Sequence, residues 1–287
     1  MFTIKTKEEI KAIREGGKIL ADIMDKVSRE IKPGAETGDL EDMVCRMMEE
    51  AGGRPAFKGF EVFRDGFFPT ALITSINEEV VHGPAKPSRK LKPGDIVGID
   101  CGMEYPIDVK RKNGELVYSV KKNNRTLPVN PYSRYGGYYT DMAKTLPVGN
   151  IDKKTKKLVK TARECLEKAI AQAKPGNKLS DIGKAVQAHA EAGGFSVVRE
   201  LVGHGVGHDV HEDPQIFNFD FSGFTFEDQA LEAGMVVALE PMVNIGGYKV
   251  RLAKDNFTFK TMDNSLSAHF EHTIAITKKG AEIMTIR

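Results

Sequence analysis

The chain of 287 residues is long enough to bury a sizeable core, either as one large domain or as two small ones. Its formal net charge of +2 is too small to indicate nucleic-acid binding by itself, and no apolar run approaches the roughly 18 residues of a membrane span. The N-terminus lacks a secretory signal and the three cysteines Cys45, Cys101 and Cys165 are widely spaced, so we expect reduced thiols in a cytoplasmic protein.

The predicted elements begin with a pair of helices. A capping box of Thr6 and Glu9 opens an amphipathic helix, whose apolar stripe continues to Ile31 and stops before Lys-Pro-Gly at residues 32–34. A second helix follows and ends at Ala-Gly-Gly, residues 51–53. Strands and helices then alternate along the chain.

The same pattern returns in the second half of the chain. Lys-Pro-Gly recurs at residues 174–176 after another long helical stretch, and Ala-Gly-Gly recurs at 192–194 after a helix that begins near Ser180. Recurrence at a fixed offset indicates an internal repeat. We therefore expect one catalytic domain over residues 1–287, built by duplication from halves of about 1–150 and 151–287.

Two predicted strands repeat at the same offset. The segment LKPGDIVGID at residues 91–100 aligns with LEAGMVVALE at 231–240, and both are short apolar runs that end on an acid. A second acid follows each strand within later β-structure. Each half therefore supplies two carboxylates from β-structure, Asp100 and Asp141 in the first half and Glu240 and Glu271 in the second.

Four carboxylates on buried strands need a neutralising partner, because burying an isolated charge is costly. Exposure at a strand end or an ion pair with lysine explains any one acid alone, but the symmetric set favours a shared divalent metal centre. The segment VGHGVGHDVHEDP at residues 202–214 holds three histidines. His204, between two glycines, adds an imidazole that favours a transition metal over magnesium or calcium.

Five motifs together carry a family resemblance: VGHGVGHDVHEDP, ALEPMV, FEHT, SINEEVVHG and GIDCG. In this order they resemble the type I methionine aminopeptidases of bacterial kind, over nearly the whole chain. The resemblance implies the α+β pita-bread fold, in which two pseudo-symmetric α/β halves surround a dinuclear metal site. It also implies a monomeric cytoplasmic hydrolase that removes initiator methionine from nascent polypeptides and prefers a small second residue.

The resemblance assigns the ligands of two divalent ions. Asp141 and Glu271 would bridge the ions, Asp100 would be terminal on one, and His204 and Glu240 would be terminal on the other. The ions would hold a water between them, lower its pKa and aim the hydroxide at the scissile carbonyl, with Glu240 as the proton acceptor. Cobalt, manganese, iron, zinc and nickel all suit such a site, so the metal stays open.

The substrate would meet an apolar pocket beside the metals, because a thioether is recognised by shape, burial and soft contacts. The resemblance places His82 and His211 outside the metal shell, where they can hydrogen-bond the substrate amide and the tetrahedral intermediate. The expected pocket walls are Phe57, Phe60, Phe68, Ile73, Val210 and Phe257.

Three further histidines have expected roles outside the metal shell and the pocket. We expect His208 to be structural or exposed, since the family does not require histidine there. From strand alternation we expect His269 and His272 to point away from the face of Glu271, which predicts packing or supporting roles for both.

The chain departs from the family pattern in two stretches. Extra residues lie near positions 60–68, beside the expected pocket. Asp100 and Asp141 are 41 residues apart, whereas the family keeps these acids close together within one hairpin. The extra segment, about 104–134, contains the hairpin-turn signal Asn113-Gly114, so we expect the hairpin to extend outward with both acids at its base.

The insert is basic. Residues 108–134 carry seven Lys or Arg and two acids. Clustered cations attract phosphate, so the insert is a candidate contact with ribosomal RNA. No aromatic-rich RNA-binding motif accompanies the charge, and a solvated surface is the simpler explanation of it. Removing the insert is expected to leave peptide turnover intact.

Two alternatives remain open from the sequence. A pita-bread aminopeptidase or dipeptidase acting on Xaa-Pro bonds is the nearest enzymatic rival, but such relatives generally carry a large N-terminal domain. A non-catalytic peptide-binding relative is the other alternative. The presence of all five ligand residues argues for an enzyme.

Overall fold

The computed structural model describes residues 1–287 except 1–2, 63–65, 113–114, 122–126 and 226. The helices are α1 (Lys7–Arg29), α2 (Thr37–Ala51), α3 (Lys153–Gln172) and α4 (Leu179–Ala192). The strands are β1 (Arg54–Pro55), β2 (Glu61–Val62), β3 (Gly66–Phe67), β4 (Leu72–Ile76), β5 (Glu79–Val81), β6 (Ile96–Tyr105), β7 (Asp108–Lys112), β8 (Glu115–Ser119), β9 (Tyr138–Pro147), β10 (Ser196–Val197), β11 (Gly203–Gly205), β12 (Glu212–Ile216), β13 (Val236–Leu239), β14 (Met242–Asn244), β15 (Val250–Leu252), β16 (Phe259–Thr261), β17 (Ser267–His269), β18 (Glu271–Thr277) and β19 (Gly280–Ile283).

The predicted helix signals are confirmed. Thr6 N donates to Glu9 Oε2 at 2.7 Å and Glu9 N donates to Thr6 Oγ1 at 3.2 Å, which completes the capping box of α1. In the second half, Asp152 caps α3 by accepting hydrogen bonds from the first backbone N–H groups of the helix. Both helix pairs therefore begin and end close to where the sequence pattern placed them.

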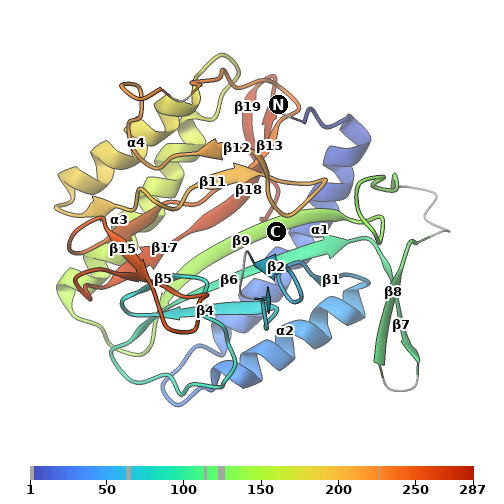
Figure 1. Ribbon diagram of the computed structural model, residues 1–287, viewed down its shortest axis with the longest axis horizontal. Helices are drawn as coiled ribbons and strands as arrows, with labels where there is room; N and C mark the ends of the chain where they lie inside the picture. Colours follow the sequence, from blue (N-terminus) through green and yellow to red (C-terminus); the bar gives the residue numbers. More distant parts are fainter. Residues whose placement is uncertain (1–2, 63–65, 113–114, 122–126, 226) are drawn as a thin grey trace.

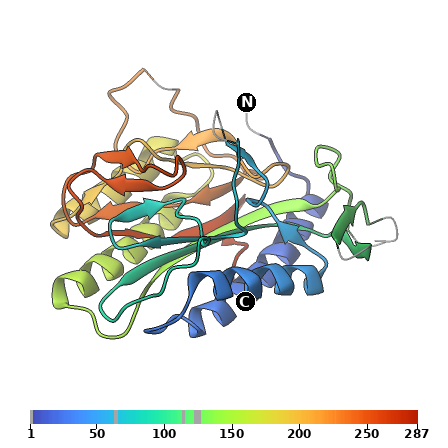
Figure 2. The ribbon, with the colours of Figure 1, turned by 60° about the horizontal axis from the view of Figure 1, so that its bottom comes forward.

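A nine-stranded sheet joins the two halves. Its strand order is β1-β6-β9-β18-β13-β11-β12, with β4 paired to β6 and β19 to β18, and its described pairings are antiparallel. The central pair β9 and β18 links a first-half strand to a second-half strand. Figure 1 shows α1 and α2 with the first half and α3 and α4 with the second, and Figure 2 shows α1 and α2 beneath the curved sheet.

Each half has its own apolar core between helices and sheet. In the first half, Leu20 of α1 packs in one cluster with Ile99 of β6. In the second half, Leu158 of α3 and Val186 of α4 share a cluster with Ile274 of β18. Because the helices bury one face of the sheet, the opposite face is left for the functional side chains.

The strand ends differ in part from the sequence expectation. Strand β13 does end immediately before Glu240, as predicted. Strand β6, however, continues five residues past Asp100 to Tyr105, so the expectation that it ends on this acid was wrong. Its long ladder with β9 carries the chain on toward the extra segment.

The extra segment forms a hairpin of its own. Strands β7 and β8 pair with each other in a separate two-stranded sheet, rather than prolonging the β6–β9 ladder, and they project from the body of the molecule (Figure 1). The predicted turn residues Asn113 and Gly114 lie outside the described residues. We call residues 106–137 the β6–β9 connection.

The three cysteines are free thiols, as expected. Cys101 is buried, and its Sγ lies 3.4 Å from the carbonyl oxygen of Ala71. Within the described ranges, none of the helices has the length and apolar character that crossing a membrane requires.

Candidate metal centre

Three neighbouring strands line up the first-half acids with Glu271. Asp100 of β6 and Glu271 of β18 both lie opposite Ala143 of β9. Directly paired residues point to the same face of a sheet, and so do residues two apart on one strand, which adds Asp141. Asp100, Asp141 and Glu271 therefore converge around one small side chain.

The second half brings its candidate ligands to the same place. His204 of β11 lies opposite Ala238 of β13, and Glu240 follows Ala238 by two residues. A Cβ added at Gly203 would lie 2.5 Å from the Ala238 carbonyl oxygen, and one at Gly205 would lie 2.2 Å from that of Asp213. The two glycines thus permit the close approach of β11 to its neighbouring backbone.

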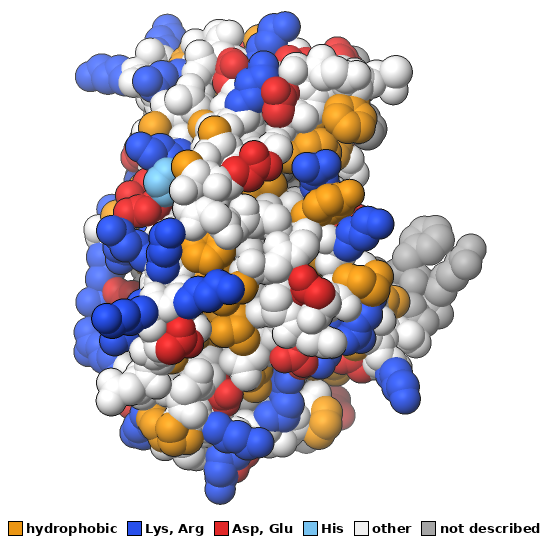
Figure 3. Space-filling view, turned by 90° about the vertical axis from the view of Figure 1, so that its left-hand side faces the viewer, with side chains coloured by type: hydrophobic (Ala, Val, Ile, Leu, Met, Phe, Trp, Pro, Cys, Tyr) orange, Lys and Arg blue, Asp and Glu red, His pale blue; other side chains and the backbone are white. Residues whose placement is uncertain are grey.

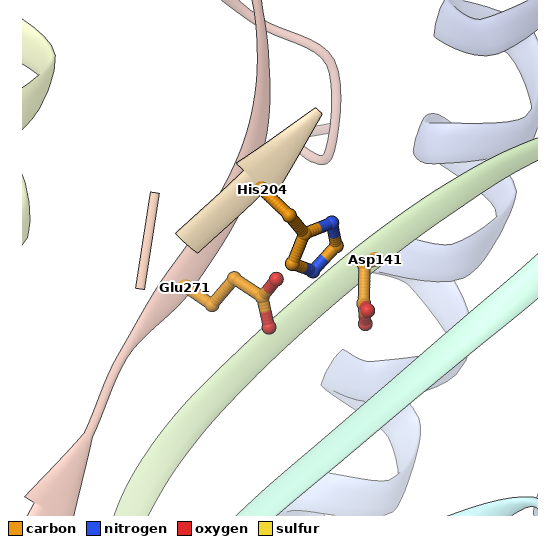
Figure 4. Close-up of side chains that lie close together, drawn as sticks. All are labelled: Asp141, His204 and Glu271. Carbon is orange, nitrogen blue, oxygen red and sulfur yellow. The ribbon is translucent and has the colours of Figure 1, made fainter. Parts of the chain in front are cut away.

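The donor atoms form a compact cluster. One ligand atom each of Asp141, His204 and Glu271 lie within 4.8 Å of one another, and Figure 4 shows the three side chains extending from different strands toward a common point. His204 Nδ1 lies 2.9 Å from the Gly205 carbonyl oxygen, which can accept its hydrogen bond. This contact leaves Nε2, which lies 3.4 Å from Glu240 Oε1, free to bind a metal.

Burial sets the electrostatics of the acids. Desolvation, reinforced by neighbouring carboxylates, raises the pKa of Asp100, Glu240 and Glu271 well above their usual ranges. Desolvation also raises the pKa of Asp141, to about 7. In the absence of a cation these carboxyl groups therefore resist ionising together.

The donor set fits a divalent transition metal. Asp100 Oδ1, Asp141 Oδ1 and Glu271 Oε1 are buried and have no hydrogen-bond partner among the described residues. Burial lowers the pKa of His204 to about 3, so its imidazole is neutral and can offer a nitrogen lone pair. Carboxylate oxygens with one imidazole are ligands that such ions accept.

The raised carboxyl pKa predicts an unusual effect of pH on the metal-free protein. Because the folded pKa of Asp141 is near 7 and its unfolded value is lower, its contribution to stability is present at acid pH and is lost as the pH rises through 7. We expect Asp141→Asn to raise the Tm of the metal-free protein at pH 8, by about 2–4 °C for each kcal/mol added to the free energy of unfolding. At pH 4 the substitution should leave the Tm nearly unchanged.

Thermal melts followed by circular dichroism in the presence of a chelator measure this difference. Glu50→Gln, at an exposed acid of α2, is the control and should shift the Tm little at either pH. An Asp141→Asn protein that melts at or below the wild-type temperature at pH 8 would contradict the account of the buried charges.

An apolar cavity opens beside the acids. It has a volume of about 150 Å³, and the four carboxylates and His204 form part of its lining. The other residues that line it are Phe57, Phe60, Val62, Phe68, Ile73, His82 and His211. Four of the six expected pocket walls therefore face the cavity, together with both expected substrate-binding histidines.

Two expected walls do not line the cavity. Val210 is 2% exposed and packs in the apolar cluster that also includes Phe57. The ring of Phe257 packs edge-on against that of Phe68, with centroids 5.4 Å apart. Val62 was missed, although its position within the predicted extra stretch beside the pocket made it a candidate.

The two cavity-lining histidines approach from different segments. His82 has a φ of 62°, in the left-handed region that few residues adopt, and burial lowers its pKa to about 4. The ring of His211 lies edge-on to that of His204, with centroids 4.5 Å apart. Burial also lowers the pKa of His211. Both rings are therefore neutral near pH 7 and can donate or accept hydrogen bonds.

His269 corrects the sequence analysis. It was expected to face away from Glu271, but its Nε2 lies 3.7 Å from Glu240 Oε2 and is buried. The spacing of two residues before Glu271 was the signal that should have placed both on one face. His272, one residue after Glu271, does point elsewhere and contacts Thr285 Oγ1 at 2.9 Å.

His208 has a structural partner. Its Nε2 lies 2.7 Å from Glu9 Oε1 of α1, and its ring packs against those of Tyr132 and Tyr138. These contacts agree with the structural role expected for this histidine.

Comparison with known protein families gives one extended match. The sequence matches Metallopeptidase family M24 over residues 11–111 and 124–278. The unmatched residues 112–123 fall within the β6–β9 connection, where the sequence departs from the family pattern.

Curated relatives match the chain over its full length. It is 41% identical to "Methionine aminopeptidase 1" of Bacillus subtilis, over 99% of this chain and 99% of that protein. It is 38% identical to "Methionine aminopeptidase" of Aquifex aeolicus, over 98% and 97% of the two chains.

Solved structures show the same likeness. Methionine aminopeptidase from Thermotoga maritima superposes with a TM-score of 0.83 and 39% identity, over 100% of both chains. The prolidase from Pyrococcus furiosus has a TM-score of 0.70 and 22% identity, and the match covers 99% of this chain but 65% of that one. These likenesses confirm the predicted pita-bread fold with its two pseudo-symmetric α/β halves.

Proposed function

Because this chain belongs to metallopeptidase family M24, we propose that its buried carboxylate site is the active site of a methionine aminopeptidase. The enzyme is a metal-dependent exopeptidase that removes N-terminal methionine from polypeptides. The main support for this proposal is the cluster of Asp141, His204 and Glu271 at the wall of an apolar cavity. The alternative of Xaa-Pro cleavage is less well supported, since the prolidase likeness is lower in identity and covers less of the partner chain.

We propose that two divalent ions bind here. The residues that would hold them are Asp100, Asp141, His204, Glu240 and Glu271, and the buried oxygens without hydrogen-bond partners support this assignment. When bound, such ions supply Lewis acidity and lower the pKa of a water molecule. The donor set suits cobalt, manganese, iron, zinc or nickel, and it does not choose among them.

The chain's own residues then handle protons and orientation. Glu240 is placed to accept the proton of the attacking water and to pass it to the leaving amine, and its backbone is held by Asn218, whose Nδ2 donates to the Glu240 carbonyl oxygen at 3.1 Å. His82 and His211 line the cavity as neutral rings, so they can hydrogen-bond the substrate amide and the tetrahedral intermediate. Together these groups fix the scissile bond beside the acids.

The apolar part of the cavity supplies selectivity for the thioether. Phe57 packs close to the sheet, since a Cβ on Gly102 would come within 2.9 Å of its Cε1. Phe68 and Ile73, 6% and 3% exposed, complete a wall without charge. We propose that the limited space beside the acids also restricts the second substrate residue to small side chains.

Substitution of a pocket wall tests this function. We expect Phe68→Ala to lower kcat/KM for Met-Ala-Ser about 10- to 100-fold, because the methionine side chain loses apolar contact, while metal content stays unchanged. Phe67→Ala is the matched control, since the neighbouring ring is 66% exposed and should be dispensable. The proposal fails if both variants keep wild-type preference for N-terminal methionine over alanine.

The substrates proposed are the N-termini of nascent polypeptides, which places the activity in the cytoplasm. We propose a single catalytic domain over residues 1–287 that arose by duplication of halves of about 1–150 and 151–287. The matching helix pairs and sheet strands of the two halves support it. We also propose a monomer, because one chain supplies every residue of the site.

We propose a ribosome contact through the basic segment 108–134. Lys110, Lys112 and Arg134 are exposed there, whereas Arg111 pairs with Glu49 of α2 at 2.6 Å. By contrast, cationic and acidic side chains intermingle on the face that carries α3 and α4 (Figure 3). Co-sedimentation with ribosomes should weaken in a Lys110→Glu, Arg134→Glu variant, and unchanged co-sedimentation would rule out this contact.

A further inference from the structure

The loop that presents His211 connects β11 to β12. Gly205 and Glu212 pair across its base, so the loop comprises residues 206–211. His204 lies at one end on β11, and His211 lies at the other. The position of the His211 ring therefore depends on what holds this loop.

Glu212, the first residue of β12, stabilises the loop through hydrogen bonds to its backbone. Its Oε1 accepts hydrogen bonds from His208 N at 2.6 Å and from Asp209 N at 3.1 Å. Its Oε2 accepts from Lys5 Nζ at 2.5 Å and from the Thr3 hydroxyl. This carboxylate ties the loop to the N-terminal segment.

The β6–β9 connection holds the same loop from another side. Asn130 is 1% exposed, and its Nδ2 donates to the His208 carbonyl oxygen at 2.9 Å and to that of Gly137 at 2.7 Å. Its Oδ1 accepts a hydrogen bond from Tyr132 N at 3.0 Å. The buried side-chain amide of Asn130 thus links the β11–β12 loop to the β6–β9 connection.

Two further contacts join these segments. The ring of Tyr132 lies over that of His208, with centroids 4.7 Å apart. Tyr139 N, two residues before Asp141 on β9, donates to the Gly207 carbonyl oxygen at 2.9 Å. The loop is therefore held in register with the strand that carries a metal-site acid.

We propose that Asn130 is a positioning residue for His211, so that the β6–β9 connection forms part of the support of the active site. The inference rests on the proposed function, because it concerns the placement of a substrate-facing histidine. A displacement of about 1 Å in such a group can lower a rate about 100-fold. Complete removal of residues 104–134, which the sequence analysis expected to leave turnover intact, is therefore expected to lower it.

A double-mutant cycle tests the role of Asn130. We expect Asn130→Ala to lower kcat/KM for Met-Ala-Ser about tenfold at unchanged metal content, because the His208 carbonyl loses its donor and His211 shifts. In a His211→Ala background the same change is expected to have less than about a twofold effect, since nothing remains to be positioned. Val117→Ala is the control, at a side chain of the same connection that is 44% exposed on β8.

A residue that only stabilises the fold would lower the Tm without coupling to His211. Equal losses in the two backgrounds, or no loss in either, would overturn the inference. If Asn130→Ala does not fold, Tyr132→Ala replaces it in the cycle, with coupling supporting the inference and independence overturning it. A wild-type protein that does not release methionine would instead contradict the proposed function.

Discussion

Glu240→Gln is expected to reduce methionine release from Met-Ala-Ser by about 10³-fold or more. The amide has the size of the carboxylate and keeps an oxygen toward the site, but it cannot accept a proton from water. Glu240 lies between His204 and His269, with Nε2 atoms 3.4 and 3.7 Å from its two oxygens, so the substitution changes the base without opening a cavity. Free methionine is measured by mass spectrometry alongside the bound metal.

The exposed acid Glu232, in the same segment before β13, provides the matched control. Glu232→Gln should retain wild-type turnover. The role given to Glu240 is wrong if the Glu240→Gln protein binds metal normally and works within about tenfold of wild type.

His204→Ala is expected to lose bound metal and, with it, at least about 10³-fold in turnover. His204 is the nitrogen donor within the cluster, and its removal leaves Asp141 and Glu271 facing each other across a buried space. Metal content after dialysis, measured by inductively coupled plasma mass spectrometry, should fall below the wild-type ratio.

His189 offers the comparison for that variant. It lies on α4 and pairs with Glu164 of α3 at 3.0 Å, outside the cavity. His189→Ala should therefore bind metal and turn over peptide as the wild type does. If the His204→Ala protein binds as much metal per protein molecule as the wild type, the assignment of His204 as a ligand is contradicted.

The sequence was informative where local rules apply. The capping box of Thr6 and Glu9 located the start of α1, and the repeat of Lys-Pro-Gly and Ala-Gly-Gly located both helix pairs. The duplicated strands with their acids predicted that Asp100 and Glu240 would reach one site, because buried carboxylates need a common partner. The structure does bring them to one cavity.

What depends on contacts between distant segments could not be predicted in the same way. The contact of Asn130 with the loop before His211 joins segments about 80 residues apart, and no local pattern encodes it. The pocket prediction included Val210 and Phe257, which contact the wall without lining the cavity, and it omitted Val62, because no local pattern gives the route of the chain near residue 60. The orientation of His269, by contrast, follows from a local rule, because residues two apart on extended chain point to the same face and His269 lies two residues before Glu271.

The measurement that tests the central claim most directly is the product spectrum of the wild-type protein. The protein is loaded in turn with manganese, cobalt or iron and incubated with Met-Ala-Ser and with Ala-Pro-containing peptides, and the products are identified by mass. The account predicts that methionine is released from Met-Ala-Ser and that the Ala-Pro peptides stay intact. Cleavage before proline, or no cleavage by protein that holds metal, would contradict it.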